Sequence, residues 1–170
     1  MRASRLDIRN NIRFQLEHVR KSTLAVLEQF KTRQDYLFQA GPKANNAIWI
    51  VTHLAMADDF MMKQIRPEQS RELGPEWKAA YWFGSVPNGL DDQNIATQEA
   101  LDYLEDRREN VWNVFESLTD EEMEQPIDPA SPFSKFPNVG YLFMFNPQHE
   151  SVHFGQLTVA HRGLGKSPRI

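Results

Sequence analysis

Residues 139–162 read VGYLFMFNPQHESVHFGQLTVAHR, and this stretch says more about the fold than any other part of the chain. Its expected inner face recurs at three- and four-residue steps, at Leu142, Phe145, His149, Val152 and Gln156. That spacing is typical of an amphipathic helix packed on one side. Two glycines, Gly163 and Gly165, follow and predict that the helix ends near residues 161–162.

Pro147 interrupts this stretch two residues before His149. A proline inside a helix removes a backbone hydrogen bond, so a kink is expected there. Alternatively, Asn146 caps a new helix whose first residue is Pro147. Both interpretations place a break in the helix close to His149 and His153.

Three further stretches toward the N-terminus carry helical periodicity. They cover residues 5–39, 44–65 and 93–118, and Ser4 with Asp7 resembles a capping box at the start of the first. The first has its apolar stripe at Ile12, Leu16, Val19, Thr23, Val26, Phe30 and Leu37. The second has its stripe at Ala47, Ile50, Leu54, Ala57 and Met61.

The segments between these helices also carry information. Residues 66–92 are long for a link between helices, and they contain prolines, glycines and four large aromatic residues, so a crossover or a lid over a site is expected. Residues 125–138 carry four prolines and predict a loop, and Thr119 predicts the cap of a short turn. Four long helices with such connections predict an all-α fold, a four-helix bundle with a crossover between its second and third helices.

Length and composition restrict the classes of protein to consider. The 170 residues suit a single domain over 1–170, and the net charge of −4 without a basic run argues against nucleic-acid binding. The absence of cysteine excludes cysteine zinc sites, a cysteine nucleophile and iron–sulfur ligation by this chain. No apolar run approaches the ~20 residues of a membrane span, and no secretory signal is visible. A cytoplasmic protein without membrane association is therefore expected.

His149 and His153 lie four residues apart, so their imidazoles share one face of the predicted helix. His53 lies on the apolar stripe of the second helix, between Ile50 and Ala57. If these helices pack together, three imidazoles meet around one divalent metal ion with an open fourth position. Imidazole suits zinc, nickel, copper or iron. The alternative is that the three histidines are satisfied core residues.

The same residues, His149-Glu150-Ser151-Val152-His153, spell the HExxH motif of zinc proteases, in which the glutamate is the general base. The longer form of that motif needs a glycine and a third histidine where this chain has Gln156 and Val159. The motif thus leaves a zincin-like hydrolase as a third hypothesis, with Glu150 as its candidate base.

At these histidines the sequence resembles the DinB-like (DinB/YfiT-type) family of metal-binding four-helix bundles. The family pattern W-x-x-x-H-L matches residues 49–54, and H-x-x-x-H-x-G-Q-L matches residues 149–157. The resemblance covers almost the whole chain, although residues 5–39 and 93–118 match by pattern only. Phe154 departs from the family, because many relatives carry a polar residue there, and Pro147 could shift the helix.

The resemblance implies the metal ligands His53, His149 and His153, zinc or nickel as the ion, and a homodimer. Relatives include thiol-dependent S-transferases, so it also implies a small-molecule thiol and an electrophile as partners. A zinc ion suits that chemistry because it lowers the pKa of a bound thiol. The alternative is a non-catalytic metal- or ligand-binding bundle that acts in a stress response.

Several neighbours of the histidines have two interpretations. Gln156 is a candidate to hydrogen-bond a ligand or a metal-bound water, or it packs as a buried amide. Asp58 and Asp59 could orient His53 or donate a carboxylate, although a solvated helix face is the simpler expectation. Arg108 could hold an anionic group of a substrate, although it is expected to reach the rim or to pair with a nearby acid. Gly155 is expected to permit a close helix approach.

The remaining histidines and the large aromatic residues are assigned structural roles. His161 is expected near the helix end and His18 at the surface. Four large aromatic residues could line an apolar pocket, although a role in the core or in a dimer interface is the simpler expectation. They are Trp49, Trp77, Trp82 and Phe83.

Overall fold

The computed structural model describes residues 8–71, 74–87 and 95–167. All regular secondary structure among these residues is helical, and they contain no strand, which confirms the all-α prediction. Among the same residues, no helix combines the length and the apolar character that crossing a membrane requires. The predicted cap of residues 4–7 lies outside the described part of the chain.

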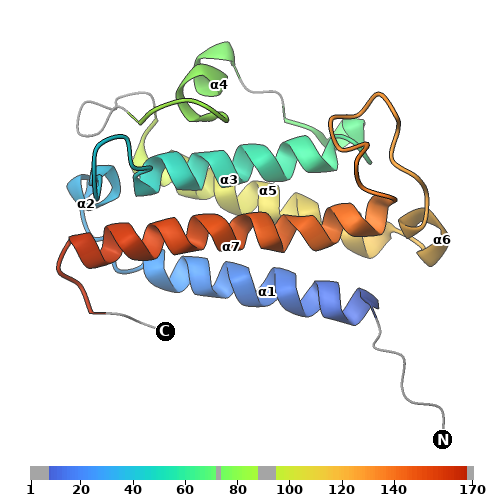
Figure 1. Ribbon diagram of the computed structural model, residues 1–170, viewed down its shortest axis with the longest axis horizontal. Coiled ribbons are helices and arrows are strands. Elements are labelled where there is room, and N and C mark those ends of the chain that lie inside the picture. The colour runs from blue at the N-terminus through green and yellow to red at the C-terminus, as the bar shows by residue number, and fades with distance from the viewer. Residues whose placement is uncertain (1–7, 72–73, 88–94, 168–170) are drawn as a thin grey trace, which may run out of the picture.

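Four long helices and several short ones make up the described chain (Figure 1). The long helices are α1 (Ile8–Leu27), α3 (Ala47–Met62), α5 (Thr97–Ser117) and α7 (Val139–Gly163). The short ones are α2 (Arg33–Leu37), the 3-10 helix η1 (Pro67–Gln69), α4 (Pro75–Tyr81) and α6 (Asp120–Met123).

The long helices lie side by side, with α1 against α7, α7 against α3, and α3 against α5. Figure 1 shows that α3 and α5 run in one direction and that α1 and α7 run in the other. The short helix α4 packs on α3. Helix α3 is therefore covered from several sides, and each of its residues except Phe60 is buried. A helix that is apolar all round is expected in such a position.

The first predicted helix is split in the structure. Helix α1 ends at Leu27, and α2 begins only at Arg33. Thr32 caps α2, because its side chain accepts a hydrogen bond from the backbone N–H of Asp35 at 3.2 Å. The Asp35 carboxylate in turn accepts from the backbone N–H of Lys31 at 2.7 Å. These local bonds offer the backbone an alternative to a continuous helix. The prediction of a single helix over residues 5–39 was therefore wrong.

Helix α7 is continuous through Pro147, so the alternative of a new helix capped by Asn146 was wrong. The Asn146 side chain is buried and hydrogen-bonds Asp58 and Arg108 instead. Val152, which was expected on the inner face, is 60% exposed. The buried face of α7 is centred on Asn146, Glu150 and Leu157 because α1 and α3 both pack against it.

The connections agree with the sequence in part. Residues 125–138 contain no helix, as expected, and Thr119 forms the capping box of α6 with Glu122. Residues 66–87 are more ordered than a plain loop, since they include η1 and α4. Each of these helices carries a proline at its start, where the missing N–H costs nothing. At the end of this segment, Tyr81 and Trp82 lie against α3.

Candidate metal centre

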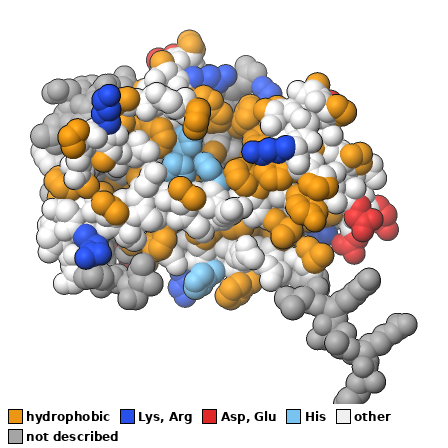
Figure 2. Space-filling view, viewed as in Figure 1, with side chains coloured by type: hydrophobic (Ala, Val, Ile, Leu, Met, Phe, Trp, Pro, Cys, Tyr) orange, Lys and Arg blue, Asp and Glu red, His pale blue; other side chains and the backbone are white. Residues whose placement is uncertain are grey.

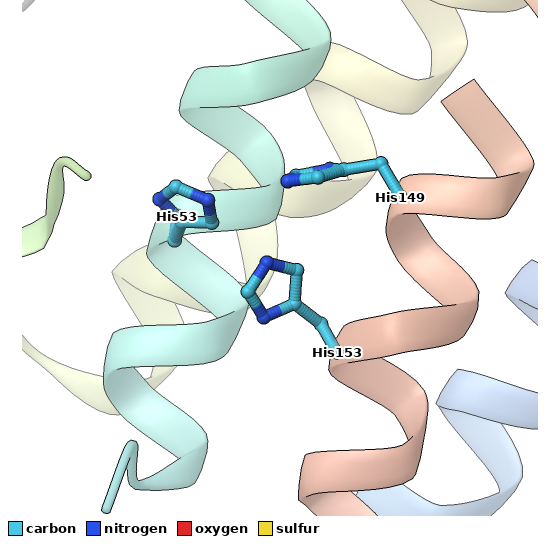
Figure 3. Close-up of side chains that lie close together, drawn as sticks. All are labelled: His53, His149 and His153. Carbon is cyan, nitrogen blue, oxygen red and sulfur yellow. The ribbon is translucent and has the colours of Figure 1, made fainter. Parts of the chain in front are cut away.

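Three histidine side chains meet between α3 and α7 (Figure 3). His53 comes from α3, whereas His149 and His153 lie one turn apart on α7. Each offers one ring nitrogen, and these nitrogen atoms all lie within 4.8 Å of one another. Imidazole nitrogens bind zinc at about 2.0–2.1 Å. Three donors at this separation suit a single ion between them, so the residues present fit a divalent metal.

His53 is held by contacts on two sides. Its Nδ1 atom lies 3.0 Å from the carbonyl oxygen of Tyr81 at the end of α4, and its ring stacks on Trp49 with centroids 4.5 Å apart. A carbonyl oxygen only accepts, so Nδ1 carries the proton. The other nitrogen, Nε2, is then left with its lone pair, which is the form that binds a metal.

His153 is oriented by Gln156, one turn further along α7. The Gln156 Oε1 atom lies 3.0 Å from His153 Nδ1 and also accepts from the side-chain amide of Asn45 at 3.1 Å. An amide oxygen accepts two hydrogen bonds, so both donors are satisfied. The arrangement again assigns the proton to Nδ1 of the histidine and leaves Nε2 for a ligand.

The environment keeps these imidazoles neutral. Burial, together with the neighbouring His153, lowers the pKa of His53 to about 4. Burial and the two other histidines lower the pKa of His149 to about 4. Burial also lowers the pKa of His153, although its contact with Gln156 opposes the change. Near neutral pH all three side chains therefore carry free lone pairs, as metal binding requires.

A cavity of about 560 Å³ opens beside the histidines. Its wall is largely aromatic, from Trp49, Phe60, Trp82, Phe83, Phe133 and Phe145. Figure 2 shows the histidine surface near the centre of this face with hydrophobic side chains around it. A largely apolar cavity with a few convergent polar groups is the usual form of a small-molecule site.

The aromatic residues singled out in the sequence divide between two places. Trp49, Trp82 and Phe83 line the histidine cavity. Trp77 instead packs edge-on against Tyr103, with ring centroids 5.6 Å apart. The pocket-lining role therefore holds for three of the four residues. Trp49 is also part of the buried core, and Trp77 is half-buried and packs against that core, so the core role holds for these two.

Glu150 is next to His149 in the sequence, but its side chain contacts arginines of other helices. Its carboxylate pairs with Arg108 and with Arg20, whose Nε lies 2.9 Å from Glu150 Oε1. Asp58 joins the same arginines, at 3.3 Å from Arg20 Nη2 and 3.2 Å from Arg108 Nη2. Asn146 donates to Asp58 at 2.7 Å. We call these five residues the buried charge cluster, and each long helix contributes at least one.

The cluster changes the interpretation of several residues. Asp58 and Asp59 are buried, so the expectation of a solvated face was wrong. Asp59 pairs with Arg107 at 2.8 Å. Arg108 pairs with acids, as one of its two interpretations required. Buried charges of this kind are retained because each has an opposite partner.

The two carboxylates of the cluster respond differently to it. Burial raises the pKa of Asp58, and the arginines offset only part of that increase. Burial also acts to raise the pKa of Glu150, but Arg20 and Arg108 together hold that pKa below its usual value. Glu150 is therefore a carboxylate neutralised by two guanidinium groups, which favours a structural role for it.

The remaining candidates lie away from the three histidines. His18 is exposed and stacks on Phe14, with ring centroids 5.4 Å apart, and His161 is buried beside Phe30. A side chain at Gly155 would meet nothing within 4 Å, so a close helix approach within the chain does not explain that glycine. The expectation for Gly155 was wrong because this position of α7 faces outward.

Sequence reasoning missed Tyr81, Asn45 and Arg20. The contact of Tyr81 is made by its backbone carbonyl, which leaves no trace in residue type. Arg20 did leave a signal, since it interrupts the apolar pattern of α1 just as Arg108 interrupts that of α5. Two arginines on inward faces require buried acids, and Asp58 and Glu150 were available.

The three histidines lie within a region of the chain that matches a known family. A family model described as the DinB superfamily matches residues 15–157, which include all three histidines. The search of curated proteins and the search of solved structures returned no match.

Proposed function

The chain belongs to the DinB superfamily, and on that premise we propose that it is a metal-dependent enzyme that transfers a small thiol to a small electrophile. The ion is zinc, or else nickel, held by His53, His149 and His153. The convergence of three ring nitrogens within 4.8 Å beside an aromatic cavity is the observation that carries this proposal. We also propose that the long helices form a four-helix bundle with a crossover connection between the second and the third, and that two copies of the chain form a homodimer.

The chemistry follows from the donor set. His53, His149 and His153 would hold the divalent metal, which would lower the pKa of a thiol bound to it. Tyr81 and Gln156 hold two of the imidazoles in the orientation that binding needs. The aromatic wall excludes water and holds the apolar part of the electrophile. The sulfur forms a bond to carbon, the leaving group departs with its electron pair, and the thiol proton passes to solvent.

The contacts of Glu150 do not favour the hydrolase hypothesis. A general base must be available to a water at the metal. The Glu150 carboxylate is 1% exposed and paired with two arginines. A thiol substrate needs no such base, because a bound divalent metal would supply the acidity of the thiol.

The test uses the full chain purified without a histidine tag. Bound metal is measured by elemental mass spectrometry, and transfer of glutathione to 1-chloro-2,4-dinitrobenzene is followed in metal-loaded and metal-stripped protein. The proposal expects close to one ion per chain and turnover only when the metal is present. An ion without turnover across a panel of thiols and electrophiles would replace the enzyme with the non-catalytic metal-binding bundle.

A further inference from the structure

The outer face of α7 carries no exposed acidic or basic side chain along most of its length. Between Val139 and His161 the sequence contains one such residue besides its histidines, Glu150, and this side chain is buried. Figure 2 shows hydrophobic side chains among uncharged ones along the middle of this face. The outer face of a helix in a soluble bundle is normally charged or polar. This face of α7 is therefore unusual for a surface that meets only water.

Apolar side chains protrude from this face at helical spacing. Tyr141, Met144, Val152 and Val159 are 48%, 43%, 60% and 58% exposed. Steps of three, eight and seven residues separate them, and each step returns to nearly the same side of the helix. We call these four residues the α7 ridge. Exposed apolar side chains gathered in this way mark a surface that binds another molecule.

Gly155 lies on the same side of α7 as the ridge. It is exposed, and a Cβ at this position would meet nothing within 4 Å. A glycine inside a helix makes that helix less stable than alanine would, and no contact within the chain explains it. The distance between two packed helices depends on the side chains at their contact, so a missing side chain permits a close approach. The glycine is thus suited to a second helix from outside the chain.

A groove of about 420 Å³ lies between α1 and α7, next to the ridge. We call it the α1–α7 groove, and its lining includes His18, Ser22 and Ala25 from α1 with Ser151 and Phe154 from α7. Of the described residues that line it, only Lys21 is charged. Phe14, which is 64% exposed, stacks on His18 with ring centroids 5.4 Å apart. The largely uncharged surface therefore extends from α7 onto α1.

The ridge and the groove lie side by side on one face, and this favours a second copy of the chain as the occupant. In a twofold dimer the same face of each copy meets itself, so a protruding ridge needs a groove beside it to receive the partner's ridge. A face without charge does not repel its own copy. By contrast, α5 exposes Asp102, Glu105 and Glu109, and two such faces would repel each other.

We propose that the α7 ridge and the α1–α7 groove form the interface between two copies of the chain, related by a twofold axis near Gly155. This inference rests on the homodimer of the proposed function and assigns its surface. Two neighbouring helices of this length present a face of roughly 30 by 20 Å, on the order of 600 Å² per copy before surface roughness is counted. A standard interface buries about 800 Å² per partner, so the face approaches the required size.

The interface borders the candidate metal centre. Val152 belongs to the ridge and also lines the histidine cavity. A second copy seated on the ridge therefore covers one side of the mouth of that cavity and limits the access of solvent to it.

The test measures the oligomeric state of the full, metal-loaded chain by sedimentation equilibrium. We expect a dimer, and we expect Val152→Glu to raise its dissociation constant at least about 100-fold, because the interface would bury an unpaired charge. Val152 is 60% exposed within the chain, so the variant should keep its helical circular dichroism and its metal content. Leu24→Glu is the matched control. Leu24 is 44% exposed and lines the cavity between α1 and α5, so this variant should remain a dimer.

Cross-linking locates the interface directly, because the chain contains no cysteine. Gly155→Cys places one thiol of each copy near the proposed axis, where the two Cα atoms come within the roughly 7 Å that a disulfide spans. We expect oxidation by diamide to give a covalent dimer of this variant and none of Leu24→Cys. A Val152→Glu variant that stays dimeric, together with a Gly155→Cys variant that does not cross-link, would place the dimer interface elsewhere and overturn the inference.

The remaining outcomes separate this inference from the proposed enzyme. A wild-type chain that is monomeric at every concentration would overturn the interface and leave the face to a different partner, without affecting metal-dependent thiol transfer. A dimer that Val152→Glu dissociates, in a wild-type chain that shows no thiol transfer, would support the interface and contradict the proposed enzyme.

Discussion

The Nδ1 atom of His53 lies 3.0 Å from the carbonyl oxygen of Tyr81, and this contact ties α3 to the segment that follows it. Tyr81 is the last residue of α4 and Trp82 comes next, so the same segment orients a histidine and supplies a wall of its cavity. Residues 75–82 therefore belong to the site as much as the long helices do.

Removing one of the three histidines should abolish metal binding. We expect His149→Ala to reduce the metal content from close to one ion per chain to nearly none, because two imidazoles leave the ion without a third protein ligand. Elemental mass spectrometry measures this directly. His18→Ala is the control, since His18 is exposed and apart from the cluster, and it should keep its full metal content.

Gln156 should act on the metal through His153. We expect Gln156→Ala to weaken metal affinity by roughly 10- to 100-fold, the usual effect of losing the partner that orients a ligand. Competition with a chromophoric chelator gives the affinity. Gln148→Ala changes an exposed glutamine of α7 and should leave the affinity unaltered. Equal affinities in the two variants would show that Gln156 is only a packing residue.

The buried charge cluster should contribute strongly to stability. In Glu150→Gln, Arg20 and Arg108 lose a buried counter-charge, so we expect the free energy of unfolding to fall by about 3–5 kcal/mol. Urea denaturation measures this change. Glu116→Gln is the matched control, because Glu116 pairs with Arg13 on the surface at 2.8 Å and should contribute about 0–1 kcal/mol. A similar small loss in both variants would contradict the assignment.

The metal-free chain should lose stability on mild acidification. The pKa values of His53 and His149 are about 4 in the folded chain, against an ordinary value of 6.5. The unfolded state therefore takes up protons first, and the free energy of unfolding decreases as the pH falls from about 6.5 toward 4. Denaturation curves across this range measure the slope, and the double variant His53→Ala, His149→Ala should flatten it.

Metal binding at neutral pH should release few protons. The three imidazoles are already neutral, because burial lowers the pKa of each of them. Metal titration by calorimetry in buffers of different ionisation enthalpy reports the number of protons released. We expect nearly the same heat in each buffer at pH 7. A release approaching one proton per histidine would contradict the neutral state.

The sequence by itself was enough to predict an all-helical fold and to predict that His53, His149 and His153 lie close together. Three- and four-residue spacing is local, so the stripe of α1 and the pair His149 and His153 could be read directly along the chain. His53 was recognised because it lies on an apolar stripe. The end of α1 at Leu27 was missed, because the hydrogen bonds of Thr32 and Asp35 outweigh a periodicity that continues to Leu37.

Only the tertiary structure decided which distant residues meet. Arg20 and Glu150 are 130 residues apart, and their pairing depends on how α1 and α7 are rotated about their axes. The same rotation exposes Val152 and buries Glu150, against the predicted inner face. The contact of His53 with Tyr81 depends on where α4 packs. Helical periodicity defines the faces of each helix, whereas the packing of all the helices together decides what those faces contact.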